Sequence, residues 1–324
     1  MVALALASLV LASAADPTAG LTTRQLAGQR IVIGFSGTSA PNPLLRRIHR
    51  GELGGVILFA ANISTRPQVR SLTRSLQRAR PDGTPPLIVA IDQEGGQVKR
   101  LGGAPTLSPP QLGTRNDPGL ARRQGVATAK NLRSVGVNVD LAPVLDVARP
   151  GSIMERQGRS FSRSASRVAR VGGAFARGLV AGGVGATGKH FPGLGAARKN
   201  QDLEFNRIGT GLKTLRAVDE RPYAGLDPPL VMVSSAIYPA LSGKPGVFSR
   251  RVVQGELREH LGFGGVTVSD ALDAPAMARY GSLHKRAVLA TRAGVDLLLY
   301  SGSGAAVADR DAARRVLEMR AGLR

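Results

Sequence analysis

Short runs of apolar, mostly β-branched residues recur along the chain, and a longer stretch with helical spacing follows most of them. Near-continuous apolar runs of this length predict strands buried on both faces, as in a parallel sheet covered by helices. The eight predicted strands are Ile31–Phe35, Gly55–Phe59, Leu87–Asp92, Val137–Pro143, Ala186–His190, Leu230–Ser234, Val266–Asp270 and Val295–Tyr300. The clearest amphipathic segments between them are Gln68–Ala79, Gly119–Ser134, Ser164–Ala181 and Arg251–Leu261.

Eight such units in 324 residues predict a closed (β/α)8 barrel of the TIM type, and an open doubly wound sheet is the alternative. The chain has no low-complexity linker and no abrupt change of composition. We therefore expect a single α/β barrel domain over residues 20–324.

Polar side chains stand at the carboxyl end of four predicted strands: Asp92, His190, Ser234 and Asp270. In a barrel these ends share one face, where the loops that follow the strands build the active site. Four reactive side chains at equivalent positions are difficult to explain by core packing alone, so this face is the expected site.

The first fifteen residues form a short apolar run that ends in the small-residue pattern Ala12-Ser13-Ala14. This pattern is typical of an export signal and its cleavage site, although the usual basic start is missing. An apolar first helix of the domain is the alternative. The run is short for a transmembrane helix.

The chain carries 44 Lys and Arg against 22 Asp and Glu, a formal net charge of +22. The arginines are scattered along the whole length, without a basic tail or an aromatic-interleaved motif, which favours a compositional bias over a specific nucleic-acid partner. A basic surface still favours contact with anionic polymers such as envelope glycans. The chain has no cysteine, which excludes disulfides and thiolate metal sites.

Three motifs carry candidate chemistry. Ile91-Asp92-Gln93-Glu94-Gly95-Gly96 leads to Arg100, and Asp92 with Arg100 can hydrogen-bond the hydroxyls of a sugar or form a structural ion pair. Gly188-Lys189-His190-Phe191-Pro192-Gly193 offers two adjacent donors at a strand end. In Gly265-Val266-Thr267-Val268-Ser269-Asp270, the final carboxylate can attack an anomeric carbon.

These motifs, together with Val231-Met232-Val233-Ser234-Ser235-Ala236, occur in the order found in glycoside hydrolase family 3, which the chain resembles over nearly its whole length. The resemblance is closest to the single-domain β-N-acetylglucosaminidases that act on peptidoglycan fragments. It implies that Asp270 is the nucleophile of a retaining mechanism with a covalent glycosyl-enzyme intermediate. It also implies substrate-binding roles for Asp92, Arg100, Arg159, Lys189 and His190.

The general acid/base departs from the family pattern. Many members of this type carry an Asp-x-His pair in the loop after Lys-His-Phe-Pro-Gly, but the four histidines here are His49, His190, His260 and His284. Asp202 stands where the loop histidine is expected, so it is the first candidate for the acid, and Glu204 is the second. The third interpretation is an inactive site that only binds glycans.

The expected function is exo-acting hydrolysis of terminal β-linked N-acetylglucosamine from cell-wall material by a secreted or envelope-bound monomer. A β-glucosidase or β-xylosidase with the same nucleophile is the alternative. No metal and no cofactor are expected, because the carboxylates lack a histidine cluster or an Asp-rich loop for metal ligation.

Overall fold

The computed structural model describes residues 16–226, 228–302, 304 and 306–323. The predicted export signal lies outside the described residues. Eight parallel strands form one sheet in the order β10-β1-β2-β3-β6-β7-β8-β9. A parallel bridge between Val268 and Leu297 joins the two ends of this sheet, so the strands close into the predicted barrel.

All eight predicted strands are present within a few residues of their expected bounds. They are β1 (Ile31–Ile33), β2 (Gly55–Leu58), β3 (Ile88–Ile91), β6 (Val139–Asp140), β7 (Gly185–Phe191), β8 (Leu230–Val233), β9 (Val266–Ser269) and β10 (Leu298–Tyr300). A short antiparallel hairpin, β4 (Gln93–Gly95) with β5 (Val98–Lys99), follows β3 and was not predicted.

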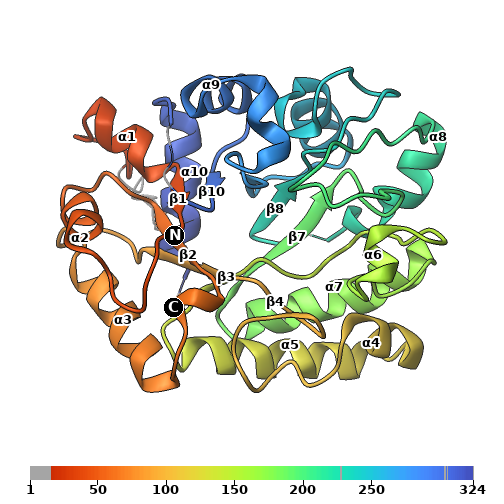
Figure 1. Ribbon diagram of the computed structural model, residues 1–324, viewed down its shortest axis with the longest axis horizontal. Helices are drawn as coiled ribbons and strands as arrows, with labels where there is room; N and C mark the ends of the chain where they lie inside the picture. The colour runs from red at the N-terminus through yellow and green to blue at the C-terminus, as the bar shows by residue number, and fades with distance from the viewer. Residues whose placement is uncertain (1–15, 227, 303, 305, 324) are drawn as a thin grey trace, which may run out of the picture.

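Helices surround the barrel (Figure 1). The long ones are α3 (Arg66–Arg78), α5 (Pro118–Arg133), α7 (Ala165–Ala181), α9 (Leu283–Ala293) and α10 (Arg310–Ala321), with η5 (Arg251–His260) between β8 and β9. Shorter ones are α1 (Thr23–Gln29), α2 (Asn42–His49), α4 (Pro109–Arg115), α6 (Ile153–Arg156), α8 (Leu212–Thr214), η1 (Ala60–Asn62), η2 (Leu215–Asp219), η3 (Arg221–Tyr223), η4 (Gly246–Phe248) and η6 (Pro275–Tyr280). Side-chain caps mark several starts: Thr65 accepts from the amide of Gln68 and Asp117 from that of Leu120.

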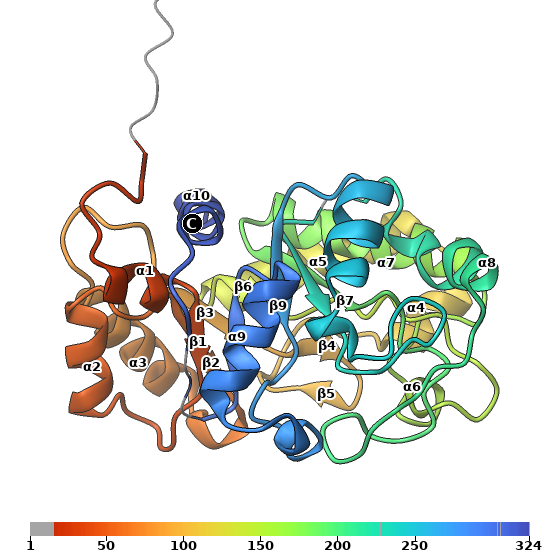
Figure 2. The same cartoon turned by 90° about the horizontal axis from the view of Figure 1, so that it is seen from above.

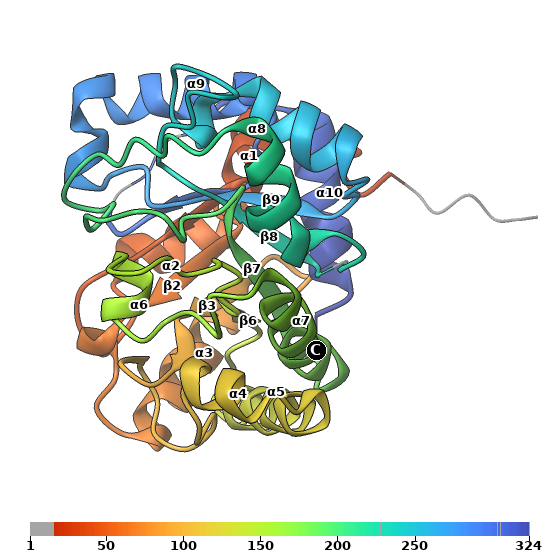
Figure 3. The same ribbon diagram turned by 90° about the vertical axis from the view of Figure 1, so that its right-hand side faces the viewer.

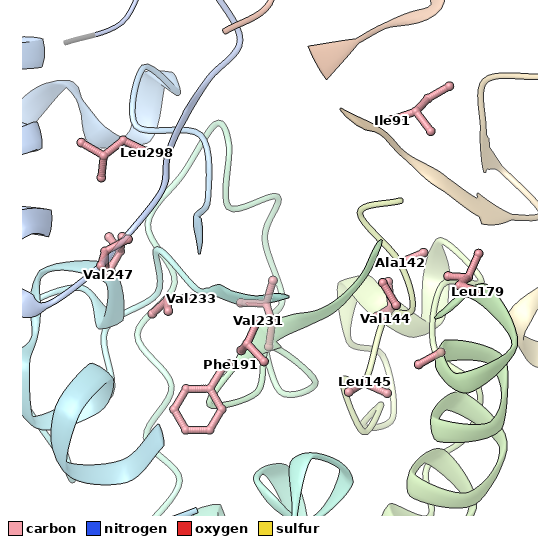
Figure 4. Packing of buried hydrophobic residues seen from close by; sticks show 14 of the residues in the cluster. Ile91, Ala142, Val144, Leu145, Leu179, Phe191, Val231, Val233, Val247 and Leu298 are labelled. Atoms are coloured by element: carbon pink, nitrogen blue, oxygen red, sulfur yellow. The ribbon is translucent and has the colours of Figure 1, made fainter. Parts of the chain in front are cut away.

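The strand side chains alternate between two apolar layers. On β3, Ile88 and Ala90 belong to the inner cluster that fills the barrel, whereas Val89 and Ile91 pack outward beneath the helices. Figure 4 shows part of this outer layer, where Phe191 lies near Val231 and Val233. The same period of two carries Asp92 inward after Ala90, and Asp270 inward after Val266 and Val268.

The two ends of the barrel differ. Helix α10 contributes Val316 to the inner cluster and closes the end where the strands begin. The β4–β5 hairpin lies on the opposite side of the molecule from α10 (Figure 2).

Helices α5 and α7 lie side by side (Figure 3), and they approach so closely that a Cβ atom on Gly125 would stand 2.2 Å from the carbonyl oxygen of Phe175. The described part of the chain contains no helix that is both long and apolar enough to cross a membrane.

Candidate active site

A cavity of about 430 Å³ opens where the barrel strands end. Its floor is apolar, formed by the uppermost inner residues Ile57, Leu141, Met232 and Leu299. All seven residues predicted for catalysis or substrate binding line it: Asp92, Arg100, Arg159, Lys189, His190, Asp202 and Asp270. The strand-end residues meet here because parallel strands deliver their carboxyl ends to the same face.

Asp270 follows β9 directly and is 8% exposed. The backbone amide of Ala271 donates to its Oδ1 at 2.8 Å, and Nε2 of Gln201 donates to its Oδ2 at 2.5 Å. These two donors hold the carboxylate in one orientation at the edge of the cavity. Gln201 in turn accepts a hydrogen bond from Ser234 Oγ at 3.4 Å.

The loop of residues 196–206 brings Gln201 and Asp202 over the barrel. Its base is closed by Asn206, which exchanges hydrogen bonds with the backbone of Lys199 at 3.1 and 2.9 Å. The carbonyl of Asp202 accepts from the amide of Ala276 at 3.1 Å, which ties the loop to η6. Both loop residues therefore have fixed backbone positions beside Asp270.

The Asp202 side chain lines the cavity and is exposed to the solvent within it. Surrounding protein atoms and then the charge of Asp270 raise the pKa of Asp202 to about 6. Glu204, the second candidate for the acid, pairs with Lys199 at 2.6 Å on the exposed side of the loop and is not among the residues that line the cavity.

Lys189 lies at the centre of a buried ionic network. Its Nζ contacts Asp92 Oδ1 and Glu94 Oε1, each at 2.7 Å. Arg159 binds Glu94 through two hydrogen bonds of 2.9 and 2.7 Å. Burial alone would raise the pKa of Glu94, but the Lys189 and Arg159 cations outweigh it and lower the pKa to about 2. Glu94 thus fixes two cations at the cavity wall.

Arg100 stands on the other side of Asp92, with 4.0 Å between its Nη2 and Asp92 Oδ2. Asp92 therefore lies between two cations, and its side chain retains 17% exposure toward the cavity. This arrangement leaves a carboxylate and a guanidinium side by side, which is the acceptor–donor pair suited to neighbouring hydroxyls.

His190 is held by a carboxylate beneath the cavity. Its Nδ1 lies 2.7 Å from Asp146 Oδ2, and Asp146 Oδ1 accepts from the backbone amides of His190 and Leu194 at 3.1 and 2.6 Å. The pairing of β7 with β8 shifts by one residue between Lys189 and Phe191, so that adjacent Lys189 and His190 both line the cavity.

Three functional candidates were missed by the sequence reasoning. Glu94, within β4, and Asp146, six residues after β6, are buried carboxylates, and the signal was a charge within an apolar or glycine-rich run. Gln201 carries no such signal, since a glutamine in a polar loop is unremarkable by sequence. Its contact with Asp270 spans 69 positions of the chain.

A parallel (β/α)8 barrel with its reactive side chains gathered at the carboxyl ends of the strands has the architecture of a barrel enzyme. The model of the glycosyl hydrolase family 3 N-terminal domain matches residues 31–318. The chain belongs to glycoside hydrolase family 3 and is a glycoside hydrolase.

Curated relatives agree with this assignment. The chain is 38% identical over 307 residues to an uncharacterized secreted glycosyl hydrolase of Arthroderma benhamiae, covering 91% of this chain and 86% of the relative. It is 37% identical over 281 residues to a β-hexosaminidase of Bordetella parapertussis, covering 83% and 78%.

Among solved structures, a family 3 β-N-acetylglucosaminidase from Paenibacillus superposes with a TM-score of 0.83 and 31% identity. The match covers 93% of this chain, which spans only 58% of that longer protein.

Proposed function

We propose that the protein is a retaining exo-β-N-acetylhexosaminidase that releases terminal β-linked N-acetylglucosamine from cell-wall glycan fragments. The observation that carries the proposal is the pairing, within one cavity, of a strand-end carboxylate, Asp270, with a loop carboxyl of raised pKa, Asp202. Retaining glycosidases need these two groups: a nucleophile and a proton donor. The β-hexosaminidase relatives support the choice of sugar.

Asp270 serves as the nucleophile. Its carboxylate attacks the anomeric carbon, the glycosidic bond breaks, and a covalent glycosyl-aspartate forms. The hydrogen bond from Gln201 lies on Oδ2, so attack through that oxygen requires Gln201 to move aside or to transfer its hydrogen bond to the substrate. Water then hydrolyses the intermediate with overall retention.

Asp202 serves as the acid/base. Protonated, it donates to the leaving oxygen in the first step, and as a carboxylate it removes a proton from water in the second. Glu204 is less suited to this role because its carboxylate is engaged by Lys199. The family's loop histidine is thus replaced in function by a carboxyl group.

The cavity wall orients the sugar. Asp92, Arg100, Lys189 and His190 present acceptors and donors to ring hydroxyls, and Arg159 completes the set beside Glu94. These groups address hydroxyls that N-acetylglucosamine shares with glucose. The choice of sugar therefore rests on the β-hexosaminidase relatives and not on these groups. We expect turnover of an aryl N-acetylglucosaminide well above that of the aryl glucoside and xyloside, and dominant glucoside turnover would overturn the choice of sugar.

The nucleophile has a direct test. An activated fluorosugar of N-acetylglucosamine should label the wild-type chain, and peptide mass spectrometry should place the label on Asp270. Asp270→Asn should lose both the label and the hydrolysis of aryl N-acetylglucosaminide. Sugar binding without any label would instead indicate a glycan-binding protein with an inactive site.

We further propose that the protein acts outside the cytoplasmic membrane as a monomer. The apolar run of residues 1–15 supports export, with the barrel domain beginning near residue 20, and the secreted Arthroderma relative is consistent with it. Cell fractionation of a tagged chain, with size-exclusion chromatography coupled to light scattering, tests both statements. A cytoplasmic protein or a stable oligomer would contradict them.

A further inference from the structure

Two glutamates and a histidine meet on the outer side of the barrel, apart from the catalytic cavity. Glu220 lies between η2 and η3, whereas Glu256 and His260 are four residues apart on η5. One ligand-type atom from each residue lies within 4.8 Å of those of the other two. None of the three lines the catalytic cavity.

Glu220 is the unusual member of this cluster. The residue is 1% exposed, and neither carboxylate oxygen has a hydrogen-bond partner within the described residues. A buried carboxylate without a partner is costly, and such groups are normally paired, protonated or bound to a metal. Its carboxylate is directed at Glu256 and His260, so the site has two acids facing each other across a small gap.

Glu256 already has one cationic neighbour. Arg216 donates to both of its oxygens at 2.9 and 3.0 Å, and the guanidinium side chain is 41% exposed. Each carboxylate oxygen has a second lone pair, so Glu256 can bind a cation while it keeps Arg216. Counted with both glutamates ionised and His260 neutral, the cluster and Arg216 carry a net charge of −1. Burial and then the Glu256 charge raise the pKa of Glu220 to about 8, so a metal ion that binds here also displaces the proton of Glu220.

We propose that Glu220, Glu256 and His260 form a binding site for a divalent metal ion of the zinc type. Imidazole nitrogen and carboxylate oxygen together are ligands for Zn²⁺ and similar first-row ions, whereas Mg²⁺ and Ca²⁺ favour oxygen alone. Bonds of about 2.0–2.2 Å to one ion require the three ligand atoms to close slightly. His260 is exposed and free to make that adjustment.

The consequence of metal binding is structural. The ion connects the segment that follows the active-site loop, which contains Glu220, to the helix between β8 and β9, which contains Glu256 and His260. It also compensates the charge of Glu220. We therefore expect zinc to raise the melting temperature of the chain without changing its hydrolytic rate, because a ligand that binds only the folded state stabilises it.

Titration calorimetry of the full chain with Zn²⁺ tests the site. One ion per chain should bind here, and Glu220→Gln and His260→Ala should each weaken this binding at least tenfold and abolish the zinc-dependent rise in melting temperature. Glu259→Gln, an exposed neighbour on the same helix, and His284→Ala, an exposed histidine on α9, are matched controls that should change the affinity less than twofold.

Anomalous diffraction from a zinc-soaked crystal shows where the ion binds. An anomalous peak should lie between the three side chains and disappear in His260→Ala, a surface substitution that leaves the fold intact. Zinc binding of unchanged affinity and stoichiometry in both site variants would overturn the proposal, and so would a peak found only in the catalytic cavity.

Discussion

A carboxyl group that donates a proton near neutrality must hold that proton, and Asp202 is placed to do so. The protein atoms around it and then the Asp270 charge raise its pKa to about 6, although its side chain meets the solvent within the cavity. The carboxylate of Glu204, by contrast, is paired with Lys199. The acid form is therefore populated below pH 6 and lost above it. The assignment of Asp202 as the acid can therefore be tested through the pH dependence of hydrolysis.

Asp202→Asn should remove the alkaline limb of the pH profile. In the parent enzyme, kcat/KM for an aryl N-acetylglucosaminide should fall as the pH rises through about 6. The variant should lose about 100-fold or more on a poor leaving group and much less on a dinitrophenyl glycoside, which needs little protonation. If kcat/KM falls equally for both substrates and still decreases as the pH rises through about 6, another residue is the proton donor.

Asp140 is a second carboxyl group with a raised pKa, and its protonation affects stability. It is fully buried beneath the ionic network, its Oδ1 accepts from the amide of Gln93 at 3.0 Å, and its Oδ2 has no hydrogen-bond partner within the described chain. Burial raises its pKa to about 8. At neutral pH this residue is therefore a neutral carboxylic acid, which an asparagine imitates in shape and charge.

Asp140→Asn should flatten the dependence of stability on pH. Between the ordinary Asp pKa and about 8, the folded chain holds one proton more than the unfolded chain, so the parent loses stability as the pH rises. One proton corresponds to about 1.4 kcal/mol per pH unit. Urea unfolding from pH 5 to 8 should show a slope about 1.4 kcal/mol per pH unit steeper for the parent and for the surface control Asp82→Asn than for Asp140→Asn. The raised pKa values of Asp219 and Glu220 contribute equally to the slopes of all three chains. Parallel slopes would show that Asp140 is ionised.

At the scale of elements, the strands were predictable and the loops were not. An apolar run bounded by turn residues specifies a buried strand, and the alternation of side chains specifies that Asp92 and Asp270 point inward. The β4–β5 hairpin was missed because its strands are only three and two residues long. The residues that hydrogen-bond Asp270 and His190, namely Gln201 and Asp146, were not predicted. The path of the loops around the barrel brings these residues together, and no local sequence pattern specifies that path.

The loop after β7 depends on Asp146, which belongs to the segment after β6. This carboxylate accepts from His190 Nδ1 and from the amides of His190 and Leu194. Asp146→Asn exchanges one acceptor oxygen for a donor and so disrupts part of this set. Buried hydrogen bonds to a charged group contribute about 1.5–3 kcal/mol, so kcat/KM should fall about 10- to 100-fold.

The measurement must separate this effect from general loss of stability. The fall should persist at temperatures where circular dichroism shows the variant fully folded, and the chemical shifts of the His190 ring should change. Asp117→Asn, at the exposed start of α5, is the matched control and should leave kcat/KM unaffected. An unaltered His190 spectrum with normal activity would mean that the loop holds His190 without Asp146.

At the scale of the whole molecule, the dominant property is the net charge of +22. The described structure neutralises part of its arginine content internally, as in Arg258 and Arg315 on the buried Asp296, but many arginines remain on the surface. The resulting field attracts anionic polymers over about 10 Å at 0.1 M salt and acts on association more than on the chemical step.

Salt should therefore separate two kinds of substrate. Raising the salt from about 20 to about 300 mM shortens the reach of the field severalfold, so KM for soluble anionic cell-wall glycan fragments should rise severalfold while kcat stays constant. A neutral aryl N-acetylglucosaminide relies on the cavity alone, and its KM should change less than twofold. If both substrates respond equally, salt acts on the cavity itself, and the basic surface has no part in selecting the substrate.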